Sequence, residues 1–391
     1  MTWKIAKLGN ICKIQSGNSI PVKEKEALYR NVEDGLPYVA TKDVGFNGVI
    51  DYENGVRIPS NYSSKFKLSK KNSTLVCAEG GSAGRKVAFS TKDCYFVNKL
   101  FSINPGSEMV SKYIYYYTLS DEFQNQFKNS LHGLIGGVSL SKIKGFQITY
   151  PSISEQQLKV AKLDTAFTEI NKGIEITNKK IENTNTLFKN YLTKFFSNNN
   201  NKLIKLKDVC TATQGVQISK SNQIKSPKKG YLRYLYISDF SHNKNVKYIE
   251  NKYPKKIVQL SDIIVANTGA SAGSIFRGVE GILSNNLFKV TPNKSLIDSD
   301  FLYYFVTSKL FKNFQKKIMR GTANPHMGHE NFLNTPLNLP NIDEQKEIVL
   351  KIFELEKNIK TLNQNYSNKI ESLNQLKLKI LFFNLNNAEA A

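Results

Sequence analysis

The feature that most constrains this chain is an internal repeat over nearly its whole length. Residues 7–157 align with residues 205–346, beginning with KLGNIC at 7–12 and KLKDVC at 205–210. A repeat of roughly 190 residues is far longer than a solenoid unit, so it predicts two complete domains of one fold. Such a chain is equivalent to a dimer within one polypeptide, and it suits a partner that itself has two halves.

A hydrophobic run that ends in a loop of small residues recurs in both copies. It occupies residues 74–84 (TLVCAEGGSAG) and residues 263–273 (IIVANTGASAG). The spacing around Lys86 does not fit a phosphate-binding P-loop, so we predict a turn between two strands. The glycines expected to shape this small-residue loop are Gly80, Gly81 and Gly84 in the first copy and Gly269 and Gly273 in the second.

Two further matches follow in the same order. Residues 98–103 (NKLFSI) match residues 285–290 (NNLFKV). Each copy then closes on Pro-x-x-x-Glu-Gln, carried by Pro151, Glu155 and Gln156 and by Pro340, Glu344 and Gln345. Acidic residues at this place complement the N-terminus of a helix, so we expect the closing motif to open one.

Each copy mixes strand and helix signals, which predicts an α+β fold. Short β-favouring runs broken by turn residues lie at 36–40 and 234–237. Later, residues 111–127 and 299–318 begin with Ser and carry apolar residues at helical spacing, so each range predicts one helix.

After each closing motif, apolar residues recur every three or four positions, which is the seam of a coiled coil. Residues 155–196 would span about 60 Å as one helix. Tyr191 and Phe195 extend the first seam, whereas Glu356 and Asn363 interrupt the second. We expect the two helices to form an intramolecular antiparallel coiled coil that relates the domains by a pseudo-twofold; an intermolecular pairing is the alternative. The seam residues are Leu163, Phe167, Ile170, Ile174, Ile181, Ile352, Ile359, Ile370 and Leu373.

These patterns define five segments. We predict a first domain at 1–150, a first spacer helix at 151–197, a second domain with a short polar linker at its start at 198–339, a second spacer helix at 340–385 and a tail at 386–391.

The net charge of +23 points to a polyanionic partner. Four cysteines without CxxC pairing indicate a reducing cytoplasm. Neither a signal peptide nor a membrane span is expected. With four histidines and no zinc motif, we expect no metal site and no catalytic site in this chain.

The doubled order of the small-residue loop, the Asn-x-Leu-Phe strand and the closing motif resembles the specificity subunit of type I restriction-modification systems. The resemblance implies two target recognition domains, each reading one half of a bipartite DNA target. The helices would set the spacing and dock two modification methyltransferase subunits, which restriction-translocation subunits would join. It also implies that S-adenosylmethionine, ATP and Mg belong to those partner subunits, and that this chain is non-catalytic.

Direct reading of double-stranded DNA needs side chains with paired donors and acceptors at the base edges, and basic side chains at the phosphates. The loops that differ between the copies on a shared scaffold are the places to find them. The candidates are Lys42, Arg85, Lys86, Lys99 and His132 in the first domain and Arg277, Asn286, Arg320, Thr322, Asn324 and His326 in the second.

Other functions remain open at this point. The chain could be a basic coiled-coil adaptor or an RNA-binding protein, an arm of a restriction enzyme without its catalytic domain, or a silent variant of a specificity subunit. Preference for B-form DNA over RNA would separate the first two from the main hypothesis.

Overall fold

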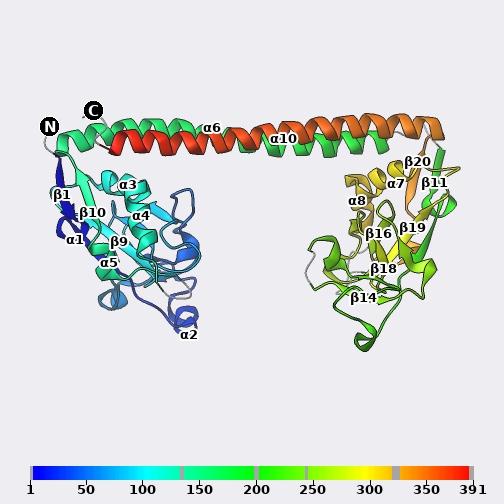
Figure 1. Cartoon of the computed structure of the whole chain (residues 1–391), viewed down its shortest axis with the longest axis horizontal. Coiled ribbons are helices and arrows are strands. Elements are labelled where there is room, and N and C mark those ends of the chain that lie inside the picture. Colours follow the sequence, from blue (N-terminus) through cyan, green and yellow to red (C-terminus); the bar gives the residue numbers. More distant parts are fainter. Residues whose placement is uncertain (1–2, 133–135, 198–201, 243–244, 319–325, 387–391) are drawn as a thin grey trace. The chain divides into compact units, whose positions relative to one another are not determined.

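The computed structural model describes residues 3–132, 136–197, 202–242, 245–318 and 326–386. It divides into two compact units, one of residues 1–177 and 368–391 and the other of residues 178–367. Two long helices, α6 (Ile153–Phe196) and α10 (Ile342–Leu385), contribute to both units. Each unit is described by itself below (Figure 1).

The first unit begins with strands and continues with helices. Its strands are β1 (Lys4–Lys7), β2 (Cys12–Ser16), β3 (Leu36–Val39), β4 (Arg57–Ile58), β5 (Leu68–Ser69), β6 (Thr74–Cys77), β7 (Val87–Phe89), β8 (Cys94–Phe96), β9 (Leu100–Pro105) and β10 (Gln147–Tyr150). Its helices before α6 are α1 (Leu8–Ile11), α2 (Val22–Glu24), η1 (Lys25–Tyr29), η2 (Thr41–Asp43), η3 (Ser60–Lys65), α3 (Ser111–Leu119), α4 (Asp121–Asn129) and α5 (Leu140–Lys144).

The second unit repeats this order. Its strands are β11 (Lys202–Lys205), β12 (Cys210–Gln214), β13 (Tyr231–Leu235), β14 (Lys247–Glu250), β15 (Ile257–Val258), β16 (Ile263–Ala266), β17 (Ile275–Phe276), β18 (Gly281–Leu283), β19 (Leu287–Pro292) and β20 (Pro336–Leu339). Its helices before α10 are η4 (Leu206–Asp208), η5 (Lys220–Asn222), η6 (Ile237–Phe240), η7 (Pro254–Lys256), η8 (Gly269–Ser271), α7 (Ser299–Thr307), α8 (Lys309–Ile318) and α9 (His329–Leu333).

The two units have the same sheet topology, which confirms that the sequence repeat is a fold repeat. The sheet of order β2-β9-β6-β7 corresponds to β12-β19-β16-β17, and β4-β3-β8-β5 corresponds to β14-β13-β18-β15. The sheets β4-β3-β8-β5 and β14-β13-β18-β15 each contain one parallel pair of strands, β3 with β8 and β13 with β18. A two-stranded ribbon, β1-β10 or β11-β20, completes each unit.

The corresponding inner strands β6 and β16 are buried on both faces. Along β6, Val76 packs in one apolar cluster while its neighbours Leu75 and Cys77 pack in another. Alternate side chains of a strand point to opposite faces, so an unbroken apolar run predicts burial on both sides. Next to one face, α3 packs between the sheet and α6 through Tyr113 and Tyr116 (Figure 1).

Each predicted helix at 111–127 and 299–318 is two helices in the structure. Helices α3 and α4 are separated at Ser120, which has an extended backbone. The Ser120 Oγ accepts a hydrogen bond from the Phe123 amide at 3.4 Å. Ser308 does the same for Phe311 at 3.2 Å. A serine that caps a new helix ends the preceding one, because its backbone leaves the helical region. The single-helix prediction was therefore wrong at these serines.

Within each unit, segments of α6 and α10 pack antiparallel along the predicted seam. In the first unit Leu163 and Phe167 share a cluster with Leu381 and Leu385. In the second, Leu192 and Phe196 share one with Ile352. The intramolecular antiparallel coiled coil is thus confirmed. Among the predicted seam residues, Leu163, Phe167, Ile170 and Ile352 are buried, whereas Ile174, Ile181, Ile359, Ile370 and Leu373 are half-buried.

The seam differs from the prediction at the end of α6. Tyr191 is exposed, and the buried residues there are Leu192 and Phe196. Phe196 packs edge-on against Phe301 and Phe305 of α7. This end of α6 packs on the globular core as well as on α10, so the apolar face shifts by one residue.

The closing motif joins the start of each long helix to the unit it leaves. Gln156 is fully buried; its Oε1 accepts from the Val110 amide at 2.8 Å, and its Nε2 donates to the Glu108 and Pro151 carbonyls. Gln345 repeats all three contacts with Asp298, Leu296 and Pro340. The conserved spacing from proline to glutamine therefore serves a buried hydrogen-bond anchor.

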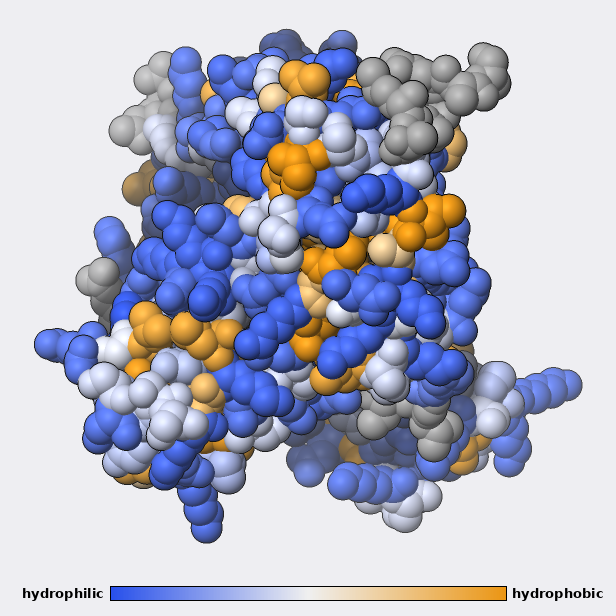
Figure 2. All heavy atoms as spheres, turned by 90° about the vertical axis from the view of Figure 1, so that its left-hand side faces the viewer, coloured by the Kyte–Doolittle hydropathy of each residue, from blue (hydrophilic) through white to orange (hydrophobic). Residues whose placement is uncertain are grey.

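The face of the molecule in Figure 2 is mostly polar. Hydrophilic residues cover most of the face shown in Figure 2, and apolar side chains form separate patches between them. Among the described residues, no helix has the length and apolar content that a membrane crossing needs.

Candidate nucleic-acid interface

The small-residue loop of the first unit connects β6 to β7, as predicted, and two other segments hold it. Its Gly80 amide donates to the Gly136 carbonyl at 2.8 Å, and the Val138 amide donates to Ala78 at 3.0 Å. On the other side, the Ala78 amide donates to the Lys99 carbonyl at 2.8 Å. The small-residue loop, the backbone at Lys99 and residues 136–138 thus lie side by side in space.

The second unit has the same arrangement. The Asn267 amide donates to the Asn286 carbonyl at 3.0 Å, and the Met327 amide donates to the Asn267 carbonyl at 2.7 Å. Thr268 forms an isolated bridge with His326, as Glu79 does with Gly137 in the first unit. We call each of these assemblies a three-loop platform, formed by residues 78–84, 97–100, 131–132 and 136–138 or by 267–273, 284–287 and 326–328.

Helices α4 and α8 each form a hydrogen bond to the small-residue loop of one platform. The Gln124 Nε2 donates to the Gly84 carbonyl at 2.9 Å, and the Gln315 Nε2 donates to the Gly273 carbonyl at 3.1 Å. Both glycines have a positive φ, +72° for Gly84 and +81° for Gly273. Residues other than glycine rarely adopt this backbone conformation. The platform backbone is therefore fixed by contacts that its neighbours provide.

Three predicted residues of the first unit lie at or beside one exposed aromatic ring that sequence reasoning missed. The Arg85 guanidinium and the Lys86 ammonium lie 5.7 and 5.3 Å from the ring centre of Phe46. Lys86 also donates to the Thr41 carbonyl at 3.0 Å, which places it beside Lys42. Phe46 is 67% exposed. An exposed ring between cations is suited to contact with a nucleic acid, because it stacks on bases while the cations meet phosphates.

The other two predicted residues of this unit lie on the platform itself. Lys99 pairs with Glu79 at 2.8 Å, and this hydrogen bond raises the pKa of the lysine. His132 is exposed, and its backbone pairs with Gly137 in both directions. Glu79 therefore offsets one of the positive charges that the platform presents.

The predicted residues of the second unit are more scattered. Asn286 and His326 are exposed on its platform. Arg277 instead lies against α7: it pairs with Asp300 at 2.9 Å, donates to the Ser261 carbonyl and lies 4.2 Å from the ring centre of Tyr303. The remaining predicted residues, Arg320, Thr322 and Asn324, lie outside the described residues.

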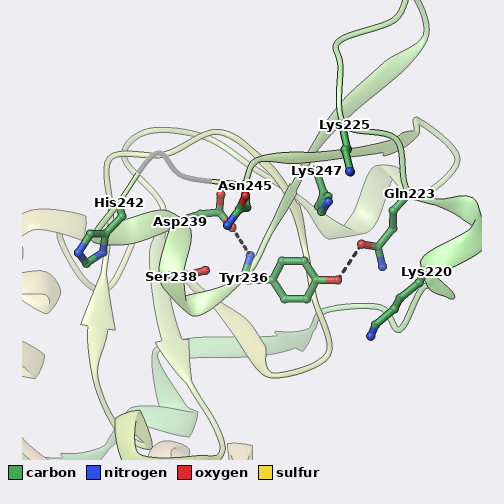
Figure 3. A pocket seen from close by; sticks show the side chains of 9 residues that line it. All are labelled: Lys220, Gln223, Lys225, Tyr236, Ser238, Asp239, His242, Asn245 and Lys247. Carbon is green, nitrogen blue, oxygen red and sulfur yellow. Dashed lines mark hydrogen bonds between the residues drawn. The ribbon is translucent and has the colours of Figure 1, made fainter. Parts of the chain in front are cut away.

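The second unit also contains a basic hollow that sequence reasoning missed. It has a volume of about 830 Å³ and lies beside β14 and η6 (Figure 3). Its lining includes Lys220, Lys225 and Lys247. The signal in the sequence was the segment 220–229, which has four lysines and no acidic residue.

The hollow and Lys42 occupy corresponding places in the two units. Asp43 Oδ2 accepts from the Ala40 amide at 2.8 Å, and Asp239 Oδ2 accepts from the Tyr236 amide at 2.9 Å. The residue before each aspartate is Lys42 in one unit and Ser238, which lines the hollow, in the other. Both units thus present positive charge at this turn, from different side chains.

The described residues offer little for catalysis. They contain no group of three or more His, Cys, Asp or Glu side chains that could hold a metal ion. Burial raises the pKa of Cys12, Cys94 and Cys210 to about 12, which leaves these thiols protonated and poorly nucleophilic at neutral pH. Burial also lowers the pKa of His329, whose Nε2 is enclosed and has no partner.

Comparison with known proteins gives one family. A family model described as "Type I restriction modification DNA specificity domain" matches residues 1–183 and again residues 198–372.

Three of the curated proteins that are similar to the chain are named as specificity subunits of type I restriction enzymes. The MjaVIII subunit of Methanocaldococcus jannaschii is 36% identical over 152 residues, which are 38% of this chain and 34% of that protein. The StySPI subunit of Salmonella potsdam and the EcoBI subunit of Escherichia coli are 20% and 19% identical over 97% of this chain, and over 87% and 85% of their own lengths.

Solved structures share the fold. A chain from a structure on complex assembly and conformational transition of the type I R-M system has a TM-score of 0.73 at 15% identity, with 98% of both chains covered. The HsdS subunit from Thermoanaerobacter tengcongensis has a TM-score of 0.54 at 17% identity, covering 98% of this chain and 97% of that one.

Proposed function

Because the chain belongs to the family of type I restriction modification DNA specificity domains, we propose that each globular unit reads one half of a bipartite DNA target. The observation that supports this most strongly is the duplicated three-loop platform. The backbone contacts of the platform recur in both units, while its exposed side chains differ. Two readers with one scaffold and different side chains are suited to a target with two different halves.

Charge would supply most of the affinity. Lys42, Arg85 and Lys86 in the first unit and the lysines of the basic hollow in the second would contact phosphates, and the platforms would contact base edges. Phosphate contacts release counterions, so affinity should fall steeply with salt; eight such contacts correspond to a slope of about −7 in log affinity against log salt.

The chain would act as the non-catalytic subunit of a larger complex. We infer that two modification methyltransferase subunits dock on the long helices, that restriction-translocation subunits join them, and that the assembly works on DNA in the cytoplasm. S-adenosylmethionine, ATP and Mg would be held by those partners. The buried cysteines and the sparse histidines of this chain are consistent with that division.

Exposed apolar side chains on the long helices support docking there. Leu350 and Phe353 of α10 are 68% and 61% exposed, and Leu187 of α6 is 68% exposed, all within the second unit. Large apolar side chains left in water on a helix indicate a protein partner. Replacing Leu350 and Phe353 with serine should abolish copurification with the methyltransferase subunit and leave DNA binding by the chain unchanged.

Salt-titrated binding tests the proposed function. The full chain should bind a DNA duplex more tightly than an RNA duplex of equal length, because side chains cannot enter the narrow major groove of A-form RNA. Selection from random duplexes, carried out with the methyltransferase partner, should return two separated conserved blocks. Equal affinity for RNA and DNA, with no selected sequence, would instead support the RNA-binding or adaptor alternative.

A further inference from the structure

The basic hollow of the second unit gathers cations from separate elements. Lys220 lies on η5, Lys225 on the following loop and Lys247 at the start of β14, and Figure 3 shows all three around one opening. His242 and Asn245 also line it. Three lysines from three elements produce a local positive potential that no single basic segment would focus in one place.

No free carboxylate neutralises this charge among the lining residues. The only acidic one is Asp239, which is 6% exposed. Its Oδ1 accepts from Arg233 Nη2 at 2.6 Å, and its Oδ2 accepts from the Tyr236 amide at 2.9 Å. In the part of the chain that the structure describes, Lys220, Lys225 and Lys247 have no acidic side chain within salt-bridge distance. The hollow therefore keeps its positive charge for a ligand.

The hollow is better suited to phosphates than to base edges. A glutamine can read adenine through its paired oxygen and nitrogen. Here, Gln223 Oε1 accepts from the Tyr236 hydroxyl at 3.0 Å, and its Nε2 donates to the Ile218 carbonyl at 3.0 Å (Figure 3). The amide is thus already used within the wall. Lysine ammonium groups, by contrast, act as point charges toward phosphate oxygens.

The first unit differs from the second at the position that corresponds to Lys247. Ile58 pairs with Leu36 as Ile249 pairs with Leu232, so Val56 corresponds to Lys247. Val56 is buried. Beside it, the Asn54 Nδ2 donates to Asp43 Oδ2 at 2.6 Å and to the Tyr38 carbonyl at 2.9 Å. Where the first unit has a buried valine, the second therefore has a lysine that lines the basic hollow.

We propose that the basic hollow binds phosphates of the DNA backbone and supplies sequence-independent affinity to the second unit alone. This assignment rests on the proposed function as a DNA reader. It makes the two units unequal: the first meets phosphates with the cations around Phe46, the second with a hollow formed by η5, η6 and β14. The hollow holds the DNA in place while the platform of the same unit reads bases.

Charge removal with a matched control tests the proposal. The full chain carrying Lys220→Gln, Lys225→Gln and Lys247→Gln is compared with one carrying Lys294→Gln, Lys309→Gln and Lys312→Gln, three exposed lysines of the same unit outside the hollow. Both variants lose the same net charge. A third variant with arginine at the three hollow positions keeps it, and circular dichroism checks the fold of each.

The hollow variant should flatten the salt slope of duplex binding by about 2 to 3, since each lost phosphate contact is worth about 0.9. Its affinity at 0.1 M salt should fall by about tenfold or more, equally for all duplex sequences, while the control changes little and the arginine variant keeps the slope. Equal effects of the hollow and control variants would overturn the proposal and leave the DNA-reading function intact. Loss confined to one base position would also overturn it, because that identifies a base reader. Absence of salt-dependent duplex binding by the unaltered chain would overturn the function as well.

Discussion

The two units have the same backbone fold, but the contacts between corresponding side chains differ. In the first, the Gln126 side chain accepts from the Gln147 amide at 2.7 Å and donates to its carbonyl at 2.8 Å. In the second, Phe314 and Pro336 help to line an apolar hollow of about 190 Å³ at that place. The paired changes show that hydrogen bonds in one copy are exchanged for apolar contacts in the other without altering the strand register.

The contacts that do not vary carry the opposite lesson. Gln156 and Gln345 make the same three hydrogen bonds with nearly the same lengths. The Asp43 and Asp239 carboxylates cap corresponding turns in the same way. The glutamine anchors and the aspartate caps are thus kept in both copies, whereas the Gln126 contact to the Gln147 backbone is not.

A paired deletion should have the largest effect, because it tests whether the helices set the spacing of the two readers. Removing Thr177–Asn183 from α6 and Gln364–Ile370 from α10 keeps the heptad phase and shortens each helix by about 10 Å. That length is about three base pairs at ~3.4 Å each. We expect binding to the native target to fall by at least about 100-fold, and selection to return a gap about three base pairs shorter. Unchanged affinity with an unchanged gap would refute the spacer role.

Next in size is the loss of the buried glutamine anchors. Gln156→Leu and Gln345→Leu should each destabilise their own unit by about 3 kcal/mol, because each leaves an amide and two carbonyls without partners. Urea denaturation measures this loss. Trp3, the single tryptophan, lies against Lys159 and reports on the first unit, so its fluorescence should shift only with Gln156→Leu. A large difference between the two losses would mean that the anchors are not equivalent.

Alanine substitutions at the platform glycines should destabilise the two units to different extents. A Cβ at Gly84 would lie 2.7 Å from the Phe127 ring, whereas one at Gly273 would lie 3.0 Å from the flexible end of Gln315. Strain at positive φ costs about 1 to 2 kcal/mol in both. The buried ring adds overpacking, so we expect about 2 to 4 kcal/mol for Gly84→Ala and about 1 to 2 kcal/mol for Gly273→Ala by thermal or urea unfolding. The reverse order would contradict the described packing.

The smallest effect concerns the polar contacts between the long helices. In the first unit, the Lys377 ammonium donates to Asn171 Oδ1 at 3.0 Å and lies 4.7 Å from the ring centre of Phe167; in the second, Asn363 pairs with Asn185 at 3.0 Å. Burial lowers the pKa of Lys377 below its ordinary value of 10.5. Between the two pKa values the folded chain binds fewer protons at this site than the unfolded chain, so stability rises with pH.

Lys377→Met removes that titration. Compared with this variant, the unaltered chain should gain stability as pH rises toward 10.5, and Asn363→Leu should leave this pH dependence in place. Denaturation midpoints measured across that range provide the check. Parallel pH profiles for the unaltered chain and Lys377→Met would contradict the buried-lysine account.

Sequence reasoning succeeded where local patterns determine structure. The repeat, the turn between strands at Gly80–Gly84 and the apolar seam follow from periodicity and glycine spacing, and the structure has all three. It failed at Ser120 and Ser308, where one capping serine outweighs a continuous helical pattern. It also placed Tyr191 rather than Leu192 in the seam, since packing on α7 decides the face there.

The candidate site divides in the same way. Arg85 and Lys86 were found because they follow a repeated loop, and Lys99 because it lies in a repeated strand motif. Their roles toward DNA, like that of Lys42, stay predictions. Phe46 and the basic hollow were missed because their members meet only through tertiary structure. Whether Lys247 joins Lys220 and Lys225 depends on the register of β13 with β14, which composition does not encode.

The account depends most on one claim, that each unit governs one half of the target. The direct measurement is to replace residues 205–339 with the corresponding segment of another specificity subunit, express the chain with its methyltransferase partner, and map the methylated adenines by single-molecule sequencing. The account predicts that one half of the recognised sequence changes while the other half and the gap stay the same. A change in both halves, or in neither, would contradict it.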